Sequence, residues 1–216
     1  MISTYMFLYL VLFVTFFATM EIIKRMANIA AEDTRKVVHA GTSTIVCSMP
    51  FFVNTTEILI LAAGFIGLLS VTKFYGLFSA VQGVKRKTIG EFAFAVGAGL
   101  AAVFLLPQHP EAFICGFVVL GISDTAAQII GEWKPIRSFR IFSQSKSLGG
   151  STAFFLATLV ILFSLARFFE IEVEVLRLTL AAMLVTLVEF SQVFGIDNLL
   201  IPISTGLVFE WMQTSF

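Results

Sequence analysis

Polar residues in two segments of this chain stand where the surrounding sequence is strongly apolar. The first segment, GISDTAAQIIG (121–131), places Asp124 about two helical turns inside a hydrophobic stretch. The second, KSLGGS (146–151), opens the next hydrophobic stretch with a lysine and two glycines. Burying a carboxylate at membrane depth costs about 2.5–3.5 kcal/mol, so such a residue usually has a function. Together the two segments indicate a nucleotide-phosphate and metal site at the inner face of a membrane.

Asp124 is the candidate metal ligand. Mg²⁺ prefers one or two carboxylates together with substrate phosphates. Gln128 and Gly131 follow Asp124 at i+4 and i+7, so the three share one face of the expected helix. The alternative is a structural carboxylate, hydrogen-bonded inside a helix bundle.

Lys146 is the candidate phosphate-binding cation. The residues that follow it are small, and a helix is expected to begin among them. Exposed amides at a helix N-terminus beside an ammonium group favour an anion. The candidate nucleotide-binding loop therefore consists of Lys146, Ser147, Gly149, Gly150 and Ser151, with Gly131 facing it.

Two further basic segments enter hydrophobic stretches. RKVVH (35–39) contributes Arg35 and Lys36 as phosphate clamps and His39 as a group that could orient a hydroxyl or accept its proton. Bases that snorkel to the membrane interface are the alternative for this segment. The run KRKTIGE (85–91) adds a second candidate set for nucleotide binding, or else a topology signal attracted to anionic lipids. Its candidate residues are Arg86, Lys87 and Glu91.

The last polar group lies near the C-terminus. Glu189 is a candidate for orienting the hydroxyl or accepting its proton, and GIDN (195–198) adds Asp197 and Asn198. Asp197 could bind a second metal ion, act as a general base, or cap the helix that starts at Asn198. Asn198 is a candidate nucleotide contact.

The composition is that of a polytopic membrane protein. Of 216 residues, 58% are hydrophobic and 13% are charged, against about 25% charged in soluble domains. The net charge is zero, which gives no indication of a nucleic-acid partner. Cys47 and Cys115 are isolated in apolar segments and are expected to be small buried hydrophobes. The N-terminal stretch lacks the features of a cleaved signal peptide and is expected to be retained as a first span.

We expect an all-α fold, a single integral-membrane domain over residues 1–216 with about seven or eight transmembrane helices. A span needs about 20 mostly apolar residues. The second, third and eighth candidates are short, so seven spans with a re-entrant piece is the alternative to eight. The candidate spans are residues 3–23, 37–54, 56–72, 88–106, 111–131, 148–167, 174–194 and 198–214.

The basic residues predict the orientation in the membrane. Twelve of the 14 Lys and Arg residues fall in the segments after the first, third and fifth spans. By the positive-inside rule these segments are cytosolic. Because the spans alternate in direction, the polar residues described above all reach the cytosolic half of the bilayer, where we expect one shared active site.

The ordered set of motifs resembles the polyprenol kinase family, which includes dolichol kinase, phytol kinase and CTP-dependent diacylglycerol kinase. The resemblance covers about residues 35–202. Two positions depart from the family pattern: Gly149 stands where the family often has Glu, and Pro135 where it commonly has Gly. The motifs are RKVVH (35–39), RKTIGE (86–91), DTAAQIIG (124–131), KSLGGS (146–151) and GIDN (195–198).

The resemblance implies transfer of the γ-phosphoryl group of CTP to a lipid alcohol at the cytosolic face. CTP would be the co-substrate and Mg²⁺ the expected cofactor. The acceptor would be an isoprenoid alcohol (phytol, polyprenol or dolichol) or diacylglycerol, drawn from the surrounding bilayer. By position, Arg35, Lys36, Asp124 and Gly131 match residues needed for activity, and Lys146, Ser147 and Gly150 match the nucleotide-binding loop.

Three other functions compete with this hypothesis. Phosphatidate cytidylyltransferases resemble the family in part, and such an enzyme would make a CDP-lipid. A small transporter could also use carboxylates inside the membrane, but the outer halves of the spans lack a matching polar chain. A non-catalytic scaffold would leave Asp124 and Lys146 unexplained.

Overall fold

The computed structural model describes residues 2–83, 88–141, 144–191 and 194–213. It is a bundle of helices with one short β-hairpin. In chain order the elements are α1 (Thr4–Ala27), α2 (Ala31–Ser48), η1 (Met49–Phe51), α3 (Thr55–Tyr75), α4 (Ser79–Gln82), α5 (Gly90–Phe104), α6 (Pro110–Val119), the π-helical η2 (Leu120–Asp124), α7 (Thr125–Trp133), β1 (Ser138–Ile141), β2 (Gln144–Ser147), α8 (Leu148–Phe168), α9 (Val175–Ser191) and α10 (Asp197–Gln213).

Local sequence signals set several helix ends. Asn54 and Glu57 form a capping box at the start of α3, each side chain accepting the other residue's backbone N–H. Gly76 ends the same helix in the left-handed conformation (φ +65°), which glycine adopts without steric cost. Ser147 caps α8 by accepting the N–H of Gly150 at 3.0 Å. The boundaries around the KSLGGS segment therefore follow from ordinary capping chemistry.

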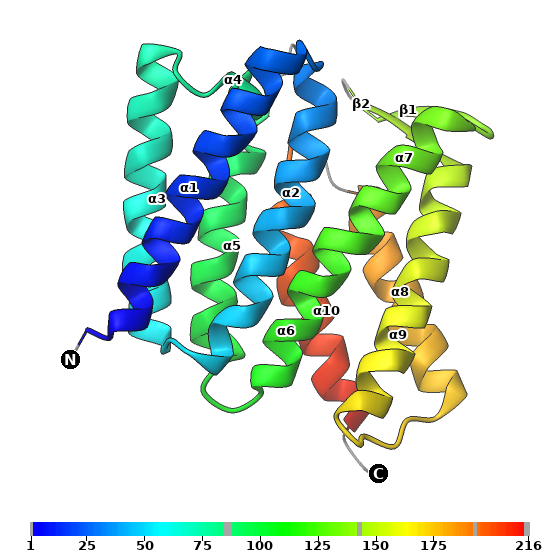
Figure 1. The fold of residues 1–216 in the computed structure, drawn as a ribbon. Helices are drawn as coiled ribbons and strands as arrows, with labels where there is room; N and C mark the ends of the chain where they lie inside the picture. The colour runs from blue at the N-terminus through cyan, green and yellow to red at the C-terminus, as the bar shows by residue number, and fades with distance from the viewer. Residues whose placement is uncertain (1, 84–87, 142–143, 192–193, 214–216) are drawn as a thin grey trace.

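The connections of the bundle gather at two ends (Figure 1). One end holds the segments that follow α1, α3 and α7, including α4 and the hairpin. The chain termini lie near the opposite end, with the α2–α3, α5–α6 and α8–α9 connections. The loops that carry most of the described basic residues thus share one end of the molecule, as the expected alternation of helix direction requires.

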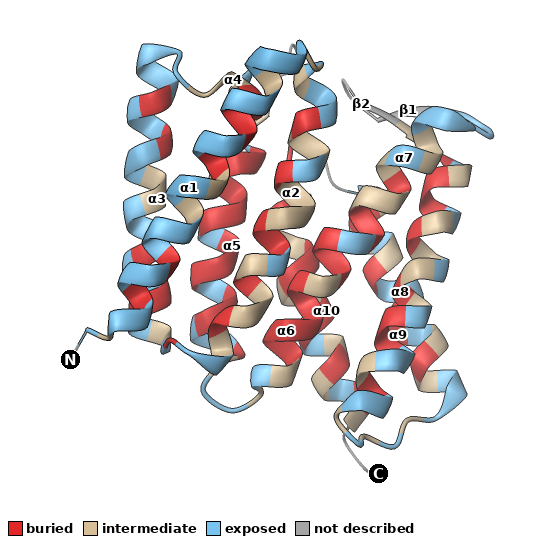
Figure 2. Ribbon diagram, viewed as in Figure 1, coloured by how far each residue is buried: buried red, intermediate tan, exposed pale blue. Residues whose placement is uncertain are grey.

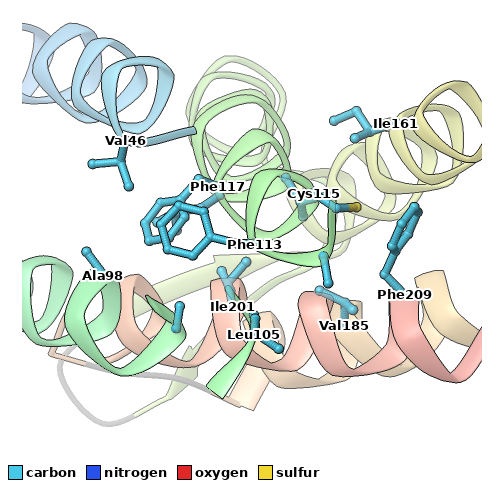
Figure 3. Packing of buried hydrophobic residues seen from close by; sticks show 14 of the residues in the cluster. Val46, Ala98, Leu105, Phe113, Cys115, Phe117, Ile161, Val185, Ile201 and Phe209 are labelled. Atoms are coloured by element: carbon cyan, nitrogen blue, oxygen red, sulfur yellow. The ribbon is translucent and has the colours of Figure 1, made fainter. Parts of the chain in front are cut away.

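The core is formed by α6 and its neighbours. Phe113, Phe117 and Phe209 are fully buried there and pack with Ile201 and Val185 (Figure 3). A Cβ on Gly116 would lie 2.4 Å from the carbonyl oxygen of Pro202, so α6 and α10 touch backbone to backbone. This packing holds the α10 N-terminus against α5 and α6.

The outer helices carry exposed apolar surface. Figure 2 shows α1 and α3 largely exposed, with α5 and α6 largely buried. Exposed side chains include Phe7 and Val11 of α1 and Val71 of α3. Apolar surface of this extent on a folded chain is typical of a protein that lies in a membrane.

Each predicted span falls on a helix, but the number of spans is not confirmed. Four helical segments within the described residues are long and apolar enough to cross a membrane: 4–27, 55–75, 110–133 and 148–168. The segment 132–147, predicted to be a loop, contains the antiparallel hairpin β1–β2, with Ser138 paired to Ser147. The helices between the four long ones are shorter, so their length does not identify them as spans.

Candidate functional site

A cavity of about 550 Å³ opens at the end of the bundle that carries the basic loops. Pockets for small molecules and cofactors typically measure about 300–1,000 Å³, so this one could hold a nucleotide. Its walls come from α2, η2, α7, β2, α8, α9, α10 and the segments beside them. The lining residues are Glu32, Arg35, His39, Thr88, Asp124, Ala127, Gln128, Gly131, Glu132, Pro135, Lys146, Ser147, Gly150, Ser151, Glu189, Gly195, Asp197 and Asn198.

Asp124 ends the π-helical segment and is buried at the cavity wall. Its Oδ2 accepts a hydrogen bond from Gln128 Nε2 at 2.6 Å and lies 3.3 Å from His39 Nε2. The predicted shared face of Asp124 and Gln128 is therefore realised as a direct contact. A single π turn inside an α-helix often marks a functional site, and here it widens the helix next to α2.

The contacts of His39 determine which ring nitrogen carries hydrogen. Nε2 lies 3.1 Å from the carbonyl oxygen of Leu120 and 3.3 Å from Asp124 Oδ2. Both neighbours are acceptors, so Nε2 must be the donor. His39 therefore anchors the Asp124 carboxylate, and its ring is fixed edge-on against Phe94 at 6.1 Å between centroids.

Lys146 reaches across the cavity to α9. Its ammonium forms an ion pair with Glu189 Oε1 and also donates to the Glu189 carbonyl oxygen at 2.9 Å. Ser151 Oγ donates to Glu189 Oε2 at 3.4 Å. These contacts use two of the three ammonium donors and both Glu189 carboxylate oxygens. Lys146 retains one donor for a phosphate oxygen, whereas Glu189 is already engaged as an acceptor.

Small residues let α7 and α8 approach closely beside this ion pair. A Cβ on Gly150 would lie 2.8 Å from the carbonyl oxygen of Ala127, and one on Gly131 would lie 3.1 Å from Ser147 Oγ. The amide of Gly150 is taken by Ser147, and that of Leu148 donates to the carbonyl oxygen of Ile136 at 3.0 Å. These two α8 amides are therefore not available to an anion, whereas the helix dipole that also favours an anion at this position remains.

Arg35 is held where α2, α5 and α10 meet. Its Nη2 donates to Thr88 Oγ1 at 3.2 Å, and a Cβ on Gly90 would lie 2.6 Å from the same nitrogen. Asn198 Nδ2 donates to the Gly90 carbonyl oxygen at 2.8 Å. A Cβ on Gly195 (φ +88°) would lie 2.5 Å from the Gly90 Cα. The glycines of two distant motifs thus make one backbone contact.

Comparison with known proteins found a similar chain of assigned function. A phytol kinase of Synechocystis sp. is 29% identical to this chain over 199 residues, which cover 88% of this chain and 83% of the relative. This similarity supports a relationship to the polyprenol and phytol kinases. No family model matches it, and no solved structure matches it.

Most of the site residues predicted from the sequence line the cavity, but several do not. The Lys36 ammonium is paired with Glu132 and lies 3.5 Å from Asp33 Oδ1, so it supports the wall without lining it. Gly149 packs on the backbone, since its Cβ would lie 2.9 Å from the carbonyl oxygen of Lys134. Glu91 lines a second, smaller cavity. Arg86 and Lys87 lie outside the described residues.

The cavity is also lined by residues that were not among the predicted site residues. Glu32 precedes Arg35 by three positions, a helical spacing that could have placed it on the same face. Glu132 follows Gly131 directly, and Pro135 closes the wall after α7. Thr88 reaches the site through Arg35. Only proximity to known motif residues could have suggested these four.

The donor set fits a hard divalent cation. The lining contains five carboxylates (Glu32, Asp124, Glu132, Glu189 and Asp197) against two permanently charged bases, Arg35 and Lys146. Asp124, at the end of η2, and Asp197, at the start of α10, both line this cavity. A group of three or more His, Cys, Asp or Glu side chains able to hold a metal is absent from the described part of the chain. Two carboxylates completed by phosphate oxygens are the arrangement that Mg²⁺ prefers.

Proposed function

We propose that the chain is a CTP-dependent kinase of a lipid alcohol, with an isoprenoid alcohol as the acceptor class and its active site on the cytosolic face. The observation that carries the proposal is the convergence of five separated motifs on one cavity of about 550 Å³. The relationship to a phytol kinase supports a phosphotransferase acting on a lipid alcohol. The gathering of the basic loops at the cavity end supports the cytosolic orientation.

Different residues of the cavity wall would bind the phosphates and the metal ion. Arg35, positioned by Thr88, and Lys146, positioned by Glu189, would contact phosphate oxygens. Asp124 and Asp197 would hold Mg²⁺, which when bound neutralises phosphate charge as the phosphoryl group transfers. His39 and Gln128 would keep the Asp124 carboxylate in place through their contacts to Oδ2. Positioning and charge neutralisation are the main needs of this chemistry.

The reaction would proceed by in-line transfer. The lipid hydroxyl oxygen forms a bond to the γ-phosphorus of CTP while the bond from that phosphorus to the β–γ bridging oxygen breaks. CDP leaves, and the hydroxyl proton passes to a base. Glu189 is poorly suited as that base because both of its carboxylate oxygens already accept hydrogen bonds. His39 Nε2 is likewise committed as a donor to Leu120 and Asp124.

Two described features argue against transport through the cavity. The core of the bundle is largely apolar, with Phe113, Phe117 and Ile201 fully buried (Figure 3). The charged lining residues come from one end of the bundle only. A transport pathway would require polar groups in both halves of one route.

The test is the fate of label from CTP. Purified protein is incubated with a long-chain isoprenoid alcohol and CTP labelled either at the γ- or at the α-phosphate. The proposal expects the lipid to acquire the γ label and CDP to accumulate in equal amount. Transfer of the α label would instead establish cytidylyl transfer, and absence of both products with a panel of lipid alcohols would reject the kinase.

A further inference from the structure

A second cavity of about 40 Å³ adjoins the first. Arg35, His39 and Asn198 line both cavities and so form the wall between them. The remaining residues are mostly apolar or aromatic. They are Phe17, Val38, Thr42, Phe65, Val81, Gly90, Glu91 and Phe94. The second cavity thus shares a wall with the candidate phosphate site but differs from it in chemistry.

Aromatic rings from the outer helices form the apolar side of the second cavity. The Phe17 ring of α1 lies 5.0 Å from Phe65 of α3 and 5.3 Å from Phe78, measured between centroids. These rings belong to a hydrophobic cluster separate from the main core. Phe65 is only half-buried, and the two helices that carry Phe17 and Phe65 expose apolar surface (Figure 2). The apolar side of the second cavity is therefore formed by the two outer helices, with Phe17 buried between them and Phe65 partly exposed.

Glu91 is the charged residue that this cavity leaves incompletely satisfied. Its side chain is 5% exposed, and its Oε1 accepts a hydrogen bond from Lys73 Nζ at 2.9 Å. Its Oε2 is buried and receives no hydrogen bond from any residue in the described part of the chain. A buried carboxylate oxygen without a donor is costly. A ligand that brings one hydrogen-bond donor would remove that cost.

The lining restricts what such a ligand can be. A volume of about 40 Å³ exceeds the roughly 10–15 Å³ of probe-occupied space that one water needs, so the end of a chain fits but a bulky head group does not. The carboxylate would repel an anionic head group. The aromatic wall favours a hydrocarbon next to the donor. A slender lipid with a terminal hydroxyl meets all three conditions.

We propose that the second cavity binds the hydroxyl end of the lipid alcohol and that Glu91 is the catalytic base. The hydroxyl donates to Glu91 Oε2, and the hydrocarbon chain leaves past Phe17 and Phe65 into the bilayer. As the hydroxyl oxygen bonds to the γ-phosphorus and the β–γ bridging bond breaks, the hydroxyl proton passes to Glu91. This inference rests on the proposed kinase function for its reaction, whereas the binding site does not depend on it.

The location of the site is tested by photolabelling. The probe is a long-chain primary alcohol with a diazirine on its chain, bound to the purified full-length protein in nanodiscs. We expect labelled peptides from α1, α3 or α5, with labelling reduced by excess unlabelled alcohol but not by the carboxylic acid of equal length. Labelling confined to other helices, or equal competition by the acid, would overturn the proposed site.

Two variants of α3 sharpen the test. Phe65→Trp adds volume to the aromatic wall and should reduce the labelling at least tenfold and raise the KM for the alcohol without changing that for CTP. Leu68→Trp places the same side chain on the exposed surface of α3. It should leave the labelling and the KM for the alcohol unchanged. Identical labelling in Phe65→Trp and the unmodified protein would contradict the proposal.

Glu91→Gln tests the chemical role. The amide keeps the shape of the side chain, and its oxygen can still accept from Lys73. We expect phosphoryl transfer at saturating alcohol to fall at least about 100-fold, in the range lost with a general base, while CTP binding and thermal stability stay near those of the unmodified protein. Lys73→Met, which keeps the carboxylate, should retain most of the activity.

The outcomes separate the two proposals. If Glu91→Gln keeps activity within twofold of the unmodified protein, Glu91 is not the catalytic base. If Glu91→Gln and Lys73→Met lose activity equally, Glu91 acts only as the ion-pair partner of Lys73. Labelling at the second cavity without any transfer from CTP would reject the kinase and keep the lipid site. Transfer from CTP with labelling elsewhere would reject only the lipid site.

Discussion

At the scale of single residues, the site is built from charged groups that hold one another in place. Asp124 is oriented by His39 and Gln128, and Lys146 by Glu189. Lys36, predicted to clamp phosphate, is instead paired with Glu132. Some charged residues thus face the cavity, whereas others hold the cavity-facing side chains or the cavity wall in position.

We expect Asp124→Asn to lower the rate of transfer from CTP to the lipid alcohol at least about 100-fold, or ~2.7 kcal/mol of transition-state stabilisation. The amide can keep the contacts to His39 and Gln128 but loses the charge that would hold Mg²⁺. Turnover of γ-labelled CTP by monodisperse purified protein measures the effect. Asp33→Asn, at an exposed position outside the cavity, is the matched control and should be near normal. Full activity in Asp124→Asn would remove this residue from the chemistry.

Lys146→Met is expected to be both less active and less stable. The Glu189 side chain is 5% exposed, and removing one partner of a buried ion pair costs about 3–5 kcal/mol because the other charge is left unpaired. The double variant Lys146→Met, Glu189→Gln should regain most of the lost stability but not the activity, since the phosphate contact is still missing. Thermal unfolding and turnover of the four proteins in this cycle are the measurements. Additive losses of stability would show that the pair is not coupled.

At the scale of elements, close helix contacts bring the motifs together. The α7–α8 contact depends on Gly131 and Gly150, and the contact between α5 and the turn before α10 depends on Gly90 and Gly195. The π-helical turn that ends at Asp124 adjusts the helix where it meets His39. Backbone approach, rather than side-chain packing, therefore sets the width of the cavity.

Gly150→Ala is expected to destabilise the protein by about 1–3 kcal/mol, as overpacking typically does, and to lower activity. The new Cβ would lie 2.8 Å from the Ala127 carbonyl oxygen and would push α7 and α8 apart. Gly64→Ala in α3 is the control, because a Cβ there meets nothing within 4 Å. It should be neutral or slightly stabilising, since Ala favours helix over Gly by about 1 kcal/mol. Equal thermal stability of the two variants would contradict the close-contact explanation.

At the scale of the whole molecule, charge and hydrophobicity are segregated. The basic loops and the cavity share one end, while apolar side chains cover α1 and α3 (Figures 1 and 2). For the proposed kinase, this arrangement would give a lipid substrate access from the side and a nucleotide access from the aqueous phase. The positive-inside rule predicts that this aqueous phase is the cytosol.

The orientation can be measured with single cysteines after Cys47 and Cys115 are replaced by Ala. Ser138→Cys lies in the exposed hairpin at the cavity end and Gln108→Cys in the exposed connection at the other end. A membrane-impermeant maleimide added to sealed cells should label position 108 and reach position 138 only after the cells are opened. The reverse pattern would place the cavity on the outer side, away from cytosolic CTP.

The positions of the helices and the shared end of the polar motifs were predictable from sequence. Each of the eight expected spans falls on a helix, with ends within a few residues for most, because long apolar stretches and capping residues act locally. The convergence of Asp124, Lys146 and Asn198 followed from the alternation of helix direction. Capping residues, the length of apolar stretches and the positions of basic loops are local features of the sequence. Predicting the helices and their direction therefore needed no tertiary information.

Tertiary structure alone decided which side chains meet. The rotation and close packing of each helix determine its contacts. Because of them, Lys146 pairs with Glu189, Lys36 pairs with Glu132, and Glu91 lines a separate cavity. The β1–β2 hairpin likewise depends on strand pairing, and no alternation of polar and apolar residues in the sequence predicts it. A helix keeps its length when it rotates by one position, but its polar residues then face different neighbours, which is why the sequence located the site without assigning the partners within it.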